Sequence, residues 1–320
     1  MNAAQSNKRF DITLVGEANI DLVLYGLPED IPPERELLAD RMAMLLGGSP
    51  AITAHNLAAL GSRVGFITAS ANDAFADLCL RDLETAGVDL SRTIRADEGA
   101  ATGFTVLLQH KQFRRMLTYP GVTNSIRFRD LDLDYLGSAR HFHLSSYFLQ
   151  KNLRPDIPRL LAELKGASLT ISFDANDDPA GEWDPSIYEA LASVDILMPN
   201  EAEACKLARE TQLDRAIRKL SGMVPIVVVK RGVRGAIAFA AGETYTAPAP
   251  EVASVDAVGA GDSFNAGFLH AYLKGDPIDR CLALGNLSGA YSTTAAGGIA
   301  AFSNREATRQ FFHENAVESK

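Results

Sequence analysis

The chain has 320 residues, of which 47% are hydrophobic and 22% are charged. These proportions are those of an ordinary globular protein and exclude the disordered, collagen-like and mucin-like classes. The formal net charge of −9 argues against a nucleic-acid binder and against a protein that binds an anionic membrane surface. No apolar run approaches the ~20 residues that a membrane span needs.

The N-terminus and the cysteines indicate a cellular compartment. The first ten residues are polar and lack the hydrophobic segment of a signal peptide. Cys79, Cys205 and Cys281 lie far apart and predict neither a disulfide framework nor a zinc site. We therefore expect the protein to work in the reducing cytoplasm.

Short apolar runs that indicate buried strands alternate with amphipathic stretches that indicate helices. This alternation predicts a parallel sheet that is covered by helices on both faces. The predicted strands are residues 11–16, 64–68, 141–144, 169–173, 195–198 and 225–230. The predicted helices are residues 50–60, 74–86, 155–165, 186–192, 201–208 and 214–220, and the chain after Asp256 is expected to be mostly helical.

Two segments interrupt this alternation. Residues 22–44 contain a proline-rich turn between short apolar pieces. Residues 102–108 and 115–119 alternate in polarity around a polar loop at 109–114, which predicts a β-hairpin. Without repeats or a clear linker, we expect one domain over residues 1–320, with a small second sheet inserted from about 17–46 and 100–122.

The stretch DAVGAGDSFNAGFLHAYLKG, residues 256–275, carries the clearest chemical signal. Its small residues at 259–261 stand before a predicted helix and let backbone N–H groups approach an anion. The helix N-terminus adds partial positive charge at the same place. Asp262 either caps this helix or takes a proton from an attacking hydroxyl group.

This stretch resembles the C-terminal signature of the ribokinase-like (PfkB) carbohydrate kinase family. The resemblance implies a three-layer α/β/α sandwich with a mostly parallel central sheet and a small β-sheet lid. It also implies phosphoryl transfer from ATP to a sugar hydroxyl. Asp262 would be the catalytic base, and Gly259, Ala260 and Gly261 would form the anion hole.

Two N-terminal motifs extend the resemblance to the acceptor side. The sequence GEANID places Asn19 and Asp21 where the family binds substrate hydroxyls, and turn formation is their alternative role. The sequence GGSPAITAHNLAALG supplies Gly47, Gly48 and Ser49. Ser49 is expected to cap a helix that has proline at its first position. The family usually has an asparagine that can contact the sugar at the position that Ile52 occupies, so this polar sugar contact is not expected here.

Further motifs resemble the family's nucleotide and metal sites. Pro199 to Glu203 match an N-x-x-E element, in which Asn200 and Glu203 would organise Mg²⁺ near the phosphates. The turn after the predicted strand 225–230 resembles the family's G-x-x-G turn beside ATP. The residues that this turn and the last helices would contribute to nucleotide binding are Lys230, Gly232, Gly235 and Asn286. Asp256, the backbone of Val258 and residues 295–302 correspond to a monovalent-cation site that could hold K⁺.

Four further residues have weaker signals. His141 and His143 lie on one strand face without a third ligand in view, so a structural role is favoured over a metal site. Asp174 and Asn176 follow a predicted core strand, where open α/β sheets bind ligands. Asp174 and Asn176 are therefore candidates for residues near the phosphates of the nucleotide.

The sequence therefore predicts an ATP- and Mg²⁺-dependent kinase of a ribose-, fructose- or sugar-acid-like acceptor. A nucleoside kinase is the alternative, with Ile52, Phe104 and Tyr119 as candidates for an apolar base pocket. A non-catalytic sugar-binding protein is a third hypothesis, which the intact Asp262 and its anion loop disfavour. Because lids of this family often pair between subunits, a homodimer through the lid sheet is a further hypothesis.

Overall fold

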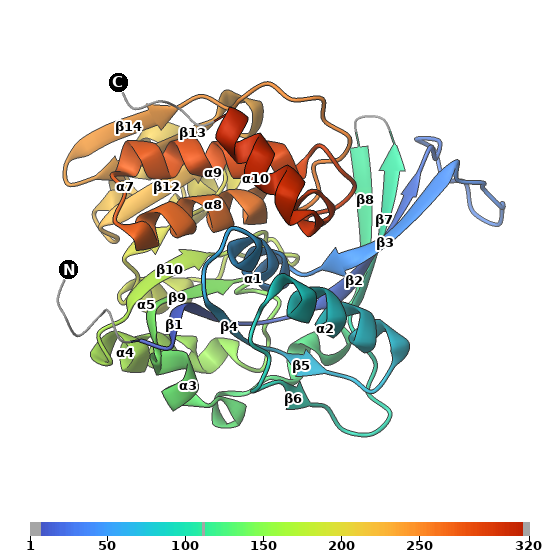
Figure 1. The fold of residues 1–320 in the computed structure, drawn as a ribbon, viewed down its shortest axis with the longest axis horizontal. Coiled ribbons are helices and arrows are strands. Elements are labelled where there is room, and N and C mark those ends of the chain that lie inside the picture. The colour runs from blue at the N-terminus through green and yellow to red at the C-terminus, as the bar shows by residue number, and fades with distance from the viewer. Residues whose placement is uncertain (1–7, 111–112, 316–320) are drawn as a thin grey trace.

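The main sheet of the computed structural model has eight strands, and the structure describes residues 8–110 and 113–315 (Figure 1). The strand order is β14-β13-β12-β11-β10-β9-β1-β4, parallel from β4 to β12 and antiparallel from β12 to β14. The strands are β1 (Phe10–Val15), β4 (Val64–Ile67), β9 (Ala139–Ser145), β10 (Thr170–Asp174), β11 (Ile196–Leu197), β12 (Ile226–Lys230), β13 (Ala236–Ala240) and β14 (Glu243–Ala247).

Helices cover both faces of this sheet, as the alternation of elements predicts. One hydrophobic cluster joins the sheet to α1 (Ser49–Ala59), α2 (Ala74–Ala86), α8 (Ala260–Lys274) and α9 (Ile278–Ser292). The other joins it to α3 (Leu133–Gly137), α4 (Ile157–Gly166), α5 (Ile187–Leu191), α6 (Glu201–Ala208) and α7 (Leu213–Ser221). The predicted three-layer fold is confirmed.

Shorter elements complete the chain. The helix α10 (Arg305–Glu314) stacks Phe311 on Tyr291 of α9, with 4.4 Å between ring centroids. The 3₁₀ helices are η2 (Gly121–Ser125), η3 (Phe128–Asp130), η4 (Arg154–Asp156), η5 (Gly232–Arg234) and η6 (Ala300–Ser303). A two-stranded sheet joins β5 (Ala69–Ser70) to β6 (Ile94–Arg95). The described residues, 8–110 and 113–315, include no helix with the length and apolarity of a membrane span.

A second sheet of four strands stands beside the main sheet, and we call it the lid sheet (Figure 1). Its order is β3-β2-β7-β8, built from β2 (Asn19–Tyr25), β3 (Arg41–Gly47), β7 (Phe104–His110) and β8 (Phe113–Tyr119). The predicted hairpin is present as β7 and β8. Its strands reach further than expected into the segment 109–114, of which residues 111–112 lie outside the described part.

The lid sheet contacts the main body through the face that carries Val23 and Tyr25. Val23 and Leu107 are buried and pack with Val258, just before the N-terminus of α8. The Tyr25 hydroxyl donates a hydrogen bond to Oδ2 of Asp256 at 2.9 Å. Side chains alternate between the two faces of a strand, so the neighbouring residues of β2 face away from the body.

Candidate functional site

The largest set of predicted residues surrounds one cleft, which we call the main cleft. It has a volume of about 820 Å³ and lies beyond the carboxyl ends of the parallel strands, where α/β folds bind ligands. The predicted residues that line it are Asn200, Glu203, Lys230, Gly232, Gly235, Gly259, Ala260, Gly261, Asp262 and Asn286. The cleft therefore joins the segments that sequence motifs assigned to the nucleotide and to catalysis.

The 259–261 loop directs the N-terminus of α8 toward the main cleft. Gly259 is the N-cap of this helix and has φ of 72°, a left-handed conformation that favours glycine. A Cβ at Gly259 would lie 2.5 Å from Cα of Gly298, so the loop has no room for a side chain there. The N–H groups of a first helical turn and the helix dipole make this terminus a suitable anion site.

Asp262 lies in the first turn of α8 and accepts a hydrogen bond on Oδ1 from the Ser49 hydroxyl. Burial raises its pKa to about 7, while the Ser49 hydrogen bond and the charge of Lys230 act in the opposite direction. A carboxyl group with this pKa accepts a proton readily near neutral pH, as a general base must.

The predicted capping role of Ser49 is wrong. The N-cap of α1 is Gly48, with φ of 91°, and Ser49 already belongs to the helix. The hydroxyl of Ser49 is directed to Asp262 instead of the helix's own N–H groups. A tertiary contact with a carboxylate has thus replaced a local cap.

Lys230 brings a positive charge to the same end of the cleft. It ends β12 and forms an ion pair with the fully buried Asp174, whose Oδ2 also accepts a 2.6 Å hydrogen bond from Asn265. Burial acts to lower the pKa of Lys230, but the charges of Asp174 and Glu203 raise it above its ordinary value. The lysine Nζ lies 3.6 Å from the point where a Cβ on Gly261 would stand, so its charge reaches the anion loop.

Asn200 and Glu203 form a reciprocal cap at the start of α6. The Asn200 side chain accepts from the Glu203 N–H at 2.9 Å, and Oε2 of Glu203 accepts from the Asn200 N–H at 2.8 Å. Burial, followed by the charge of Asp174, raises the pKa of Glu203 to about 7. Within residues 8–110 and 113–315, no group of three His, Cys, Asp or Glu side chains forms a metal site.

Gly232, Gly235 and Asn286 form another part of the cleft wall. Gly235 has φ of 80°, and a Cβ there would lie 2.0 Å from the Ala247 carbonyl oxygen. The Asn286 amide donates to the same carbonyl at 2.9 Å and to the Pro248 carbonyl at 3.2 Å. Asn286 thus fixes the segment after β14 as well as lining the cleft.

The predicted acceptor residues lie beside Asp262 and do not line the main cleft. Asp21 is 9% exposed, and its carboxylate lies 2.3 Å from the point where a Cβ on Gly47 would stand. Its charge contributes to the raised pKa of Asp262, after the larger effects of burial and of the Asp174 charge. Asn19 is buried, and its Oδ1 accepts a hydrogen bond from the Thr123 hydroxyl at 2.9 Å.

Asp256 and Val258 lie behind the anion loop. The Asp256 carboxylate accepts hydrogen bonds from the Tyr25 hydroxyl at 2.9 Å, the Val258 N–H at 3.0 Å and the Gly297 N–H at 3.1 Å. It therefore connects the lid sheet to the loops at 256–258 and 295–302.

Two interpretations from the sequence have different outcomes. Both ring nitrogens of His141 lie 2.7 Å from hydroxyls, those of Thr170 and Ser172, and Nδ1 of His143 shares the same serine. Their structural role is confirmed. The predicted apolar base pocket is not confirmed. Ile52 is only 3% exposed and packs against Gly298, whereas Tyr119 is 58% exposed to solvent.

The sequence interpretation missed part of the cleft on α9. Besides Asn286, the residues Gly289, Ala290 and Thr293 line it. Their spacing of i, i+3, i+4 and i+7 is that of one helical face, so periodicity from Asn286 would have identified them. Asn176 also lines the cleft, whereas Asp174 lies beneath it and holds Lys230.

The raised pKa of Asp262 predicts the effect of Asp262→Asn on stability. The folded state keeps a proton on this group that the unfolded state releases, so the carboxyl group lowers stability as pH rises from about 4 to 7. The variant removes this cost, and its free energy of unfolding should exceed that of the unmodified protein by about 1–3 kcal/mol at about pH 8. The difference should shrink toward about pH 4.

Urea denaturation of both proteins across this pH range measures the effect. The predicted stability gain of Asp262→Asn is larger at about pH 8 than at about pH 4. A gain that is smaller at about pH 8 than at about pH 4 would contradict the raised pKa of the buried carboxyl group.

Comparison with known proteins identifies the chain's relatives. Residues 9–305 match the model of the pfkB family carbohydrate kinase. The chain is 32% identical to an ATP-dependent ribose-1-phosphate kinase of Halopiger xanaduensis over 80% of this chain and 82% of that protein. It is 30% identical to a nucleoside kinase of Methanothermobacter thermautotrophicus over 85% of each chain.

Solved structures agree with this assignment. A putative ribokinase II from E. coli is 25% identical and has a TM-score of 0.83 in its apo form, covering 95% of this chain and 99% of its own. Its complex with ATP and Mg²⁺ has a TM-score of 0.81 over the same coverage. The chain therefore belongs to the pfkB family and is a carbohydrate kinase, a phosphotransferase that acts on a sugar.

Proposed function

We propose that this kinase transfers the γ-phosphoryl group of ATP to a hydroxyl of a small sugar, with Asp262 as the general base. The observation that carries the proposal is the position of Asp262. It lines the main cleft at the N-terminus of α8, and the charge of Asp21 reaches it from the acceptor side. A base between an anion-binding loop and a hydroxyl-binding carboxylate is what this reaction needs.

ATP would occupy the main cleft, with its phosphates at the 259–261 loop. Gly232, Gly235 and Asn286 would then lie beside the nucleoside end. The E. coli relative was solved in complex with ATP and Mg²⁺, which supports ATP as the nucleotide. The cleft volume of about 820 Å³ is in the range of sites for ligands of this size.

Asn200 and Glu203 fit a role in holding Mg²⁺. This ion is usually bound by one or two carboxylates together with water and substrate phosphates, so it needs no cage of protein ligands. Glu203 provides a carboxylate at the cleft wall, and Asn200 fixes its orientation through the reciprocal cap. When bound, the ion neutralises charge on the phosphate oxygens.

The reaction forms a bond between the acceptor oxygen and the γ-phosphorus and breaks the bond from that phosphorus to the β,γ-bridging oxygen of ATP. The acceptor proton goes to Asp262, and ADP leaves. Lys230 and the N–H groups of the 259–261 loop stabilise the charge on the transferring group.

Asp21, with Gly47 and Asn19 beside it, would bind the acceptor's hydroxyl groups. An ionised carboxylate can accept hydrogen bonds from two hydroxyls, as neighbouring sugar hydroxyls require. This favours a ribose-, fructose- or sugar-acid-like acceptor. A nucleoside is the second candidate, because a relative with 30% identity is a nucleoside kinase.

The acceptor class can be tested by measuring ADP formation from ATP and Mg²⁺ with a panel of sugars, sugar phosphates, sugar acids and nucleosides. We expect stimulation by a free or phosphorylated sugar of at least about tenfold over the rate without acceptor, because water is a poor substitute for a bound hydroxyl. Stimulation by nucleosides alone would identify the second candidate. A folded sample that no acceptor stimulates would contradict the proposed function.

We also propose that K⁺ supports the anion loop, bound by the backbone carbonyls of Asp256, Val258 and residues 295–302. The three hydrogen bonds to the Asp256 carboxylate hold both loops beside the N-terminus of α8. Replacing K⁺ by choline at equal ionic strength should lower kcat severalfold. Equal kcat in the two salts would overturn this part of the proposal.

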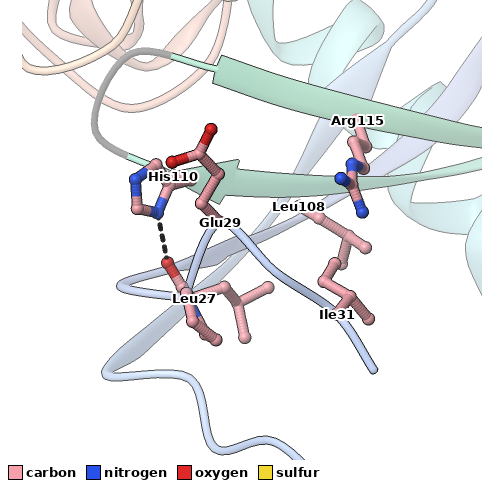
Figure 2. A pocket seen from close by; sticks show the side chains of 7 residues that line it. Leu27, Glu29, Ile31, Leu108, His110 and Arg115 are labelled. Carbon is pink, nitrogen blue, oxygen red and sulfur yellow. Dashed lines mark hydrogen bonds between the residues drawn. The ribbon is translucent and has the colours of Figure 1, made fainter. Parts of the chain in front are cut away.

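The lid sheet is proposed to pair with the lid sheet of a second copy. Its outer face carries the cross-strand row Met44, Leu22, Val106 and Leu117, in which Met44 is 44% and Leu117 is 61% exposed. A groove of about 330 Å³ continues this face and is lined by Leu108, Arg115 and the 27–31 segment (Figure 2). A hydrogen bond between His110 and the Leu27 carbonyl holds this segment beside β7. An apolar row of this kind is typical of a protein interface.

Light scattering of the Leu117→Lys variant tests the dimer. We expect the unmodified protein to be a dimer and the variant to be a monomer at micromolar concentration, because the lysine charge would be buried in the interface. Met223→Lys is the matched control, since Met223 is 43% exposed just after α7, outside the lid sheet. A monomeric unmodified protein would contradict the dimer.

We place the enzyme in the cytoplasm, where ATP is available and thiols stay reduced. Cys79, Cys205 and Cys281 are all free thiols in the structure, which fits a reducing compartment.

A further inference from the structure

A buried carboxyl group that the proposed reaction does not use lies close to Asp262. Glu17 follows β1 and is 2% exposed. Its Oε1 accepts a hydrogen bond from the Ser146 hydroxyl at 2.5 Å. Its Oε2 has no hydrogen-bond partner within the described ranges 8–110 and 113–315. A buried carboxyl oxygen without a partner costs stability.

Glu17 contacts the turn that carries the hydrogen-bond donor of Asp262. A Cβ on Gly48 would lie 2.8 Å from the Glu17 carbonyl oxygen and 3.1 Å from its Cγ, so the glutamate packs directly against this turn. The N–H of Ser49 is also directed to the Glu17 carboxylate, where it acts to lower the pKa of this group. Since the Ser49 hydroxyl donates to Asp262, a displacement of Glu17 would move the donor of the base.

The two carboxyl groups also repel each other. Burial raises the pKa of Glu17 to about 7, and the charge of Asp262 contributes in the same direction. Repulsion is mutual, so an ionised Glu17 makes Asp262 hold its proton more firmly. The charges of Asp21 from β2, Asp174 from β10 and Lys230 from β12 also act on the pKa of Asp262.

We propose that Glu17 is a positioning residue for Asp262, which fixes the Gly48–Ser49 turn by packing and strengthens the base by its negative charge. This inference rests on the proposed role of Asp262 in the reaction. Glu17 itself need not touch ATP, because it does not line the main cleft, and with 2% of its surface exposed it offers little contact to an acceptor.

The variant Glu17→Gln separates charge from shape, since glutamine keeps an acceptor oxygen for Ser146. The protein is labelled with ¹³C at the aspartate carboxyl carbons, and the Asp262 signal, assigned through Asp262→Asn, is followed against pH. We expect the titration midpoint of Asp262 to fall by about half a pH unit or more in Glu17→Gln, because a like charge has been removed. An unchanged midpoint would overturn the proposal.

Asp178→Asn is the matched control. Asp178 is a buried carboxylate that accepts N–H groups of Ala180, Glu182 and Trp183 and does not line the main cleft. This variant should leave the Asp262 midpoint unchanged. A midpoint shift in Asp178→Asn equal to that in Glu17→Gln would also overturn the proposal, because the effect would then be general.

Kinetics with the identified acceptor give the second readout. The acidic limb of kcat against pH should move to lower pH in Glu17→Gln, with KM for ATP changed less than about twofold, since the nucleotide side is untouched. A limb that stays in place would contradict the proposal while leaving the kinase function intact. If no acceptor is phosphorylated, the proposed function fails, and the carboxyl titration still decides whether Glu17 acts on Asp262.

Discussion

The site depends on burying several ionisable groups in a small volume at the carboxyl edge of the main sheet. Burial raises the pKa values of Glu17, Glu203 and Asp262 to about 7 each, whereas Lys230 keeps its charge through Asp174 and Glu203. The carboxyl groups therefore exchange protons near neutral pH beside a fixed positive charge. Burying these groups lowers the stability of the fold. The hydrophobic clusters on both faces of the sheet must offset this loss.

Local sequence patterns predicted most of the elements that form this edge. The predicted helices 74–86 and 201–208 coincide with α2 and α6, and the strands of the parallel part are found within two residues of their predicted bounds. Each of these segments has its own apolar periodicity and its own turn residues, so neighbours in the sequence are enough to identify it. The anion loop could be predicted for the same reason, because glycines and the helix start are contiguous there.

Contacts between distant segments explain what the sequence did not predict. Ser49 has the sequence context of a helix cap, but Asp262, more than 200 residues later in the chain, takes its hydroxyl. Asn286 was assigned to the nucleotide, and its amide also holds the 247–248 carbonyls. The partnership of Glu17 with Ser146 and the Gly48 turn likewise requires the ends of β1 and β9 to be adjacent. No periodicity within one segment records such pairings.

Transfer of label from [γ-³²P]ATP to the acceptor in a single turnover tests the central role of Asp262 most directly. The unmodified enzyme should label the acceptor, and Asp262→Asn should bind ATP with unchanged Kd but transfer the label about a thousandfold more slowly, as expected for loss of a general base. Transfer by the variant at a rate near that of the unmodified enzyme would show that another group accepts the proton and would contradict the account.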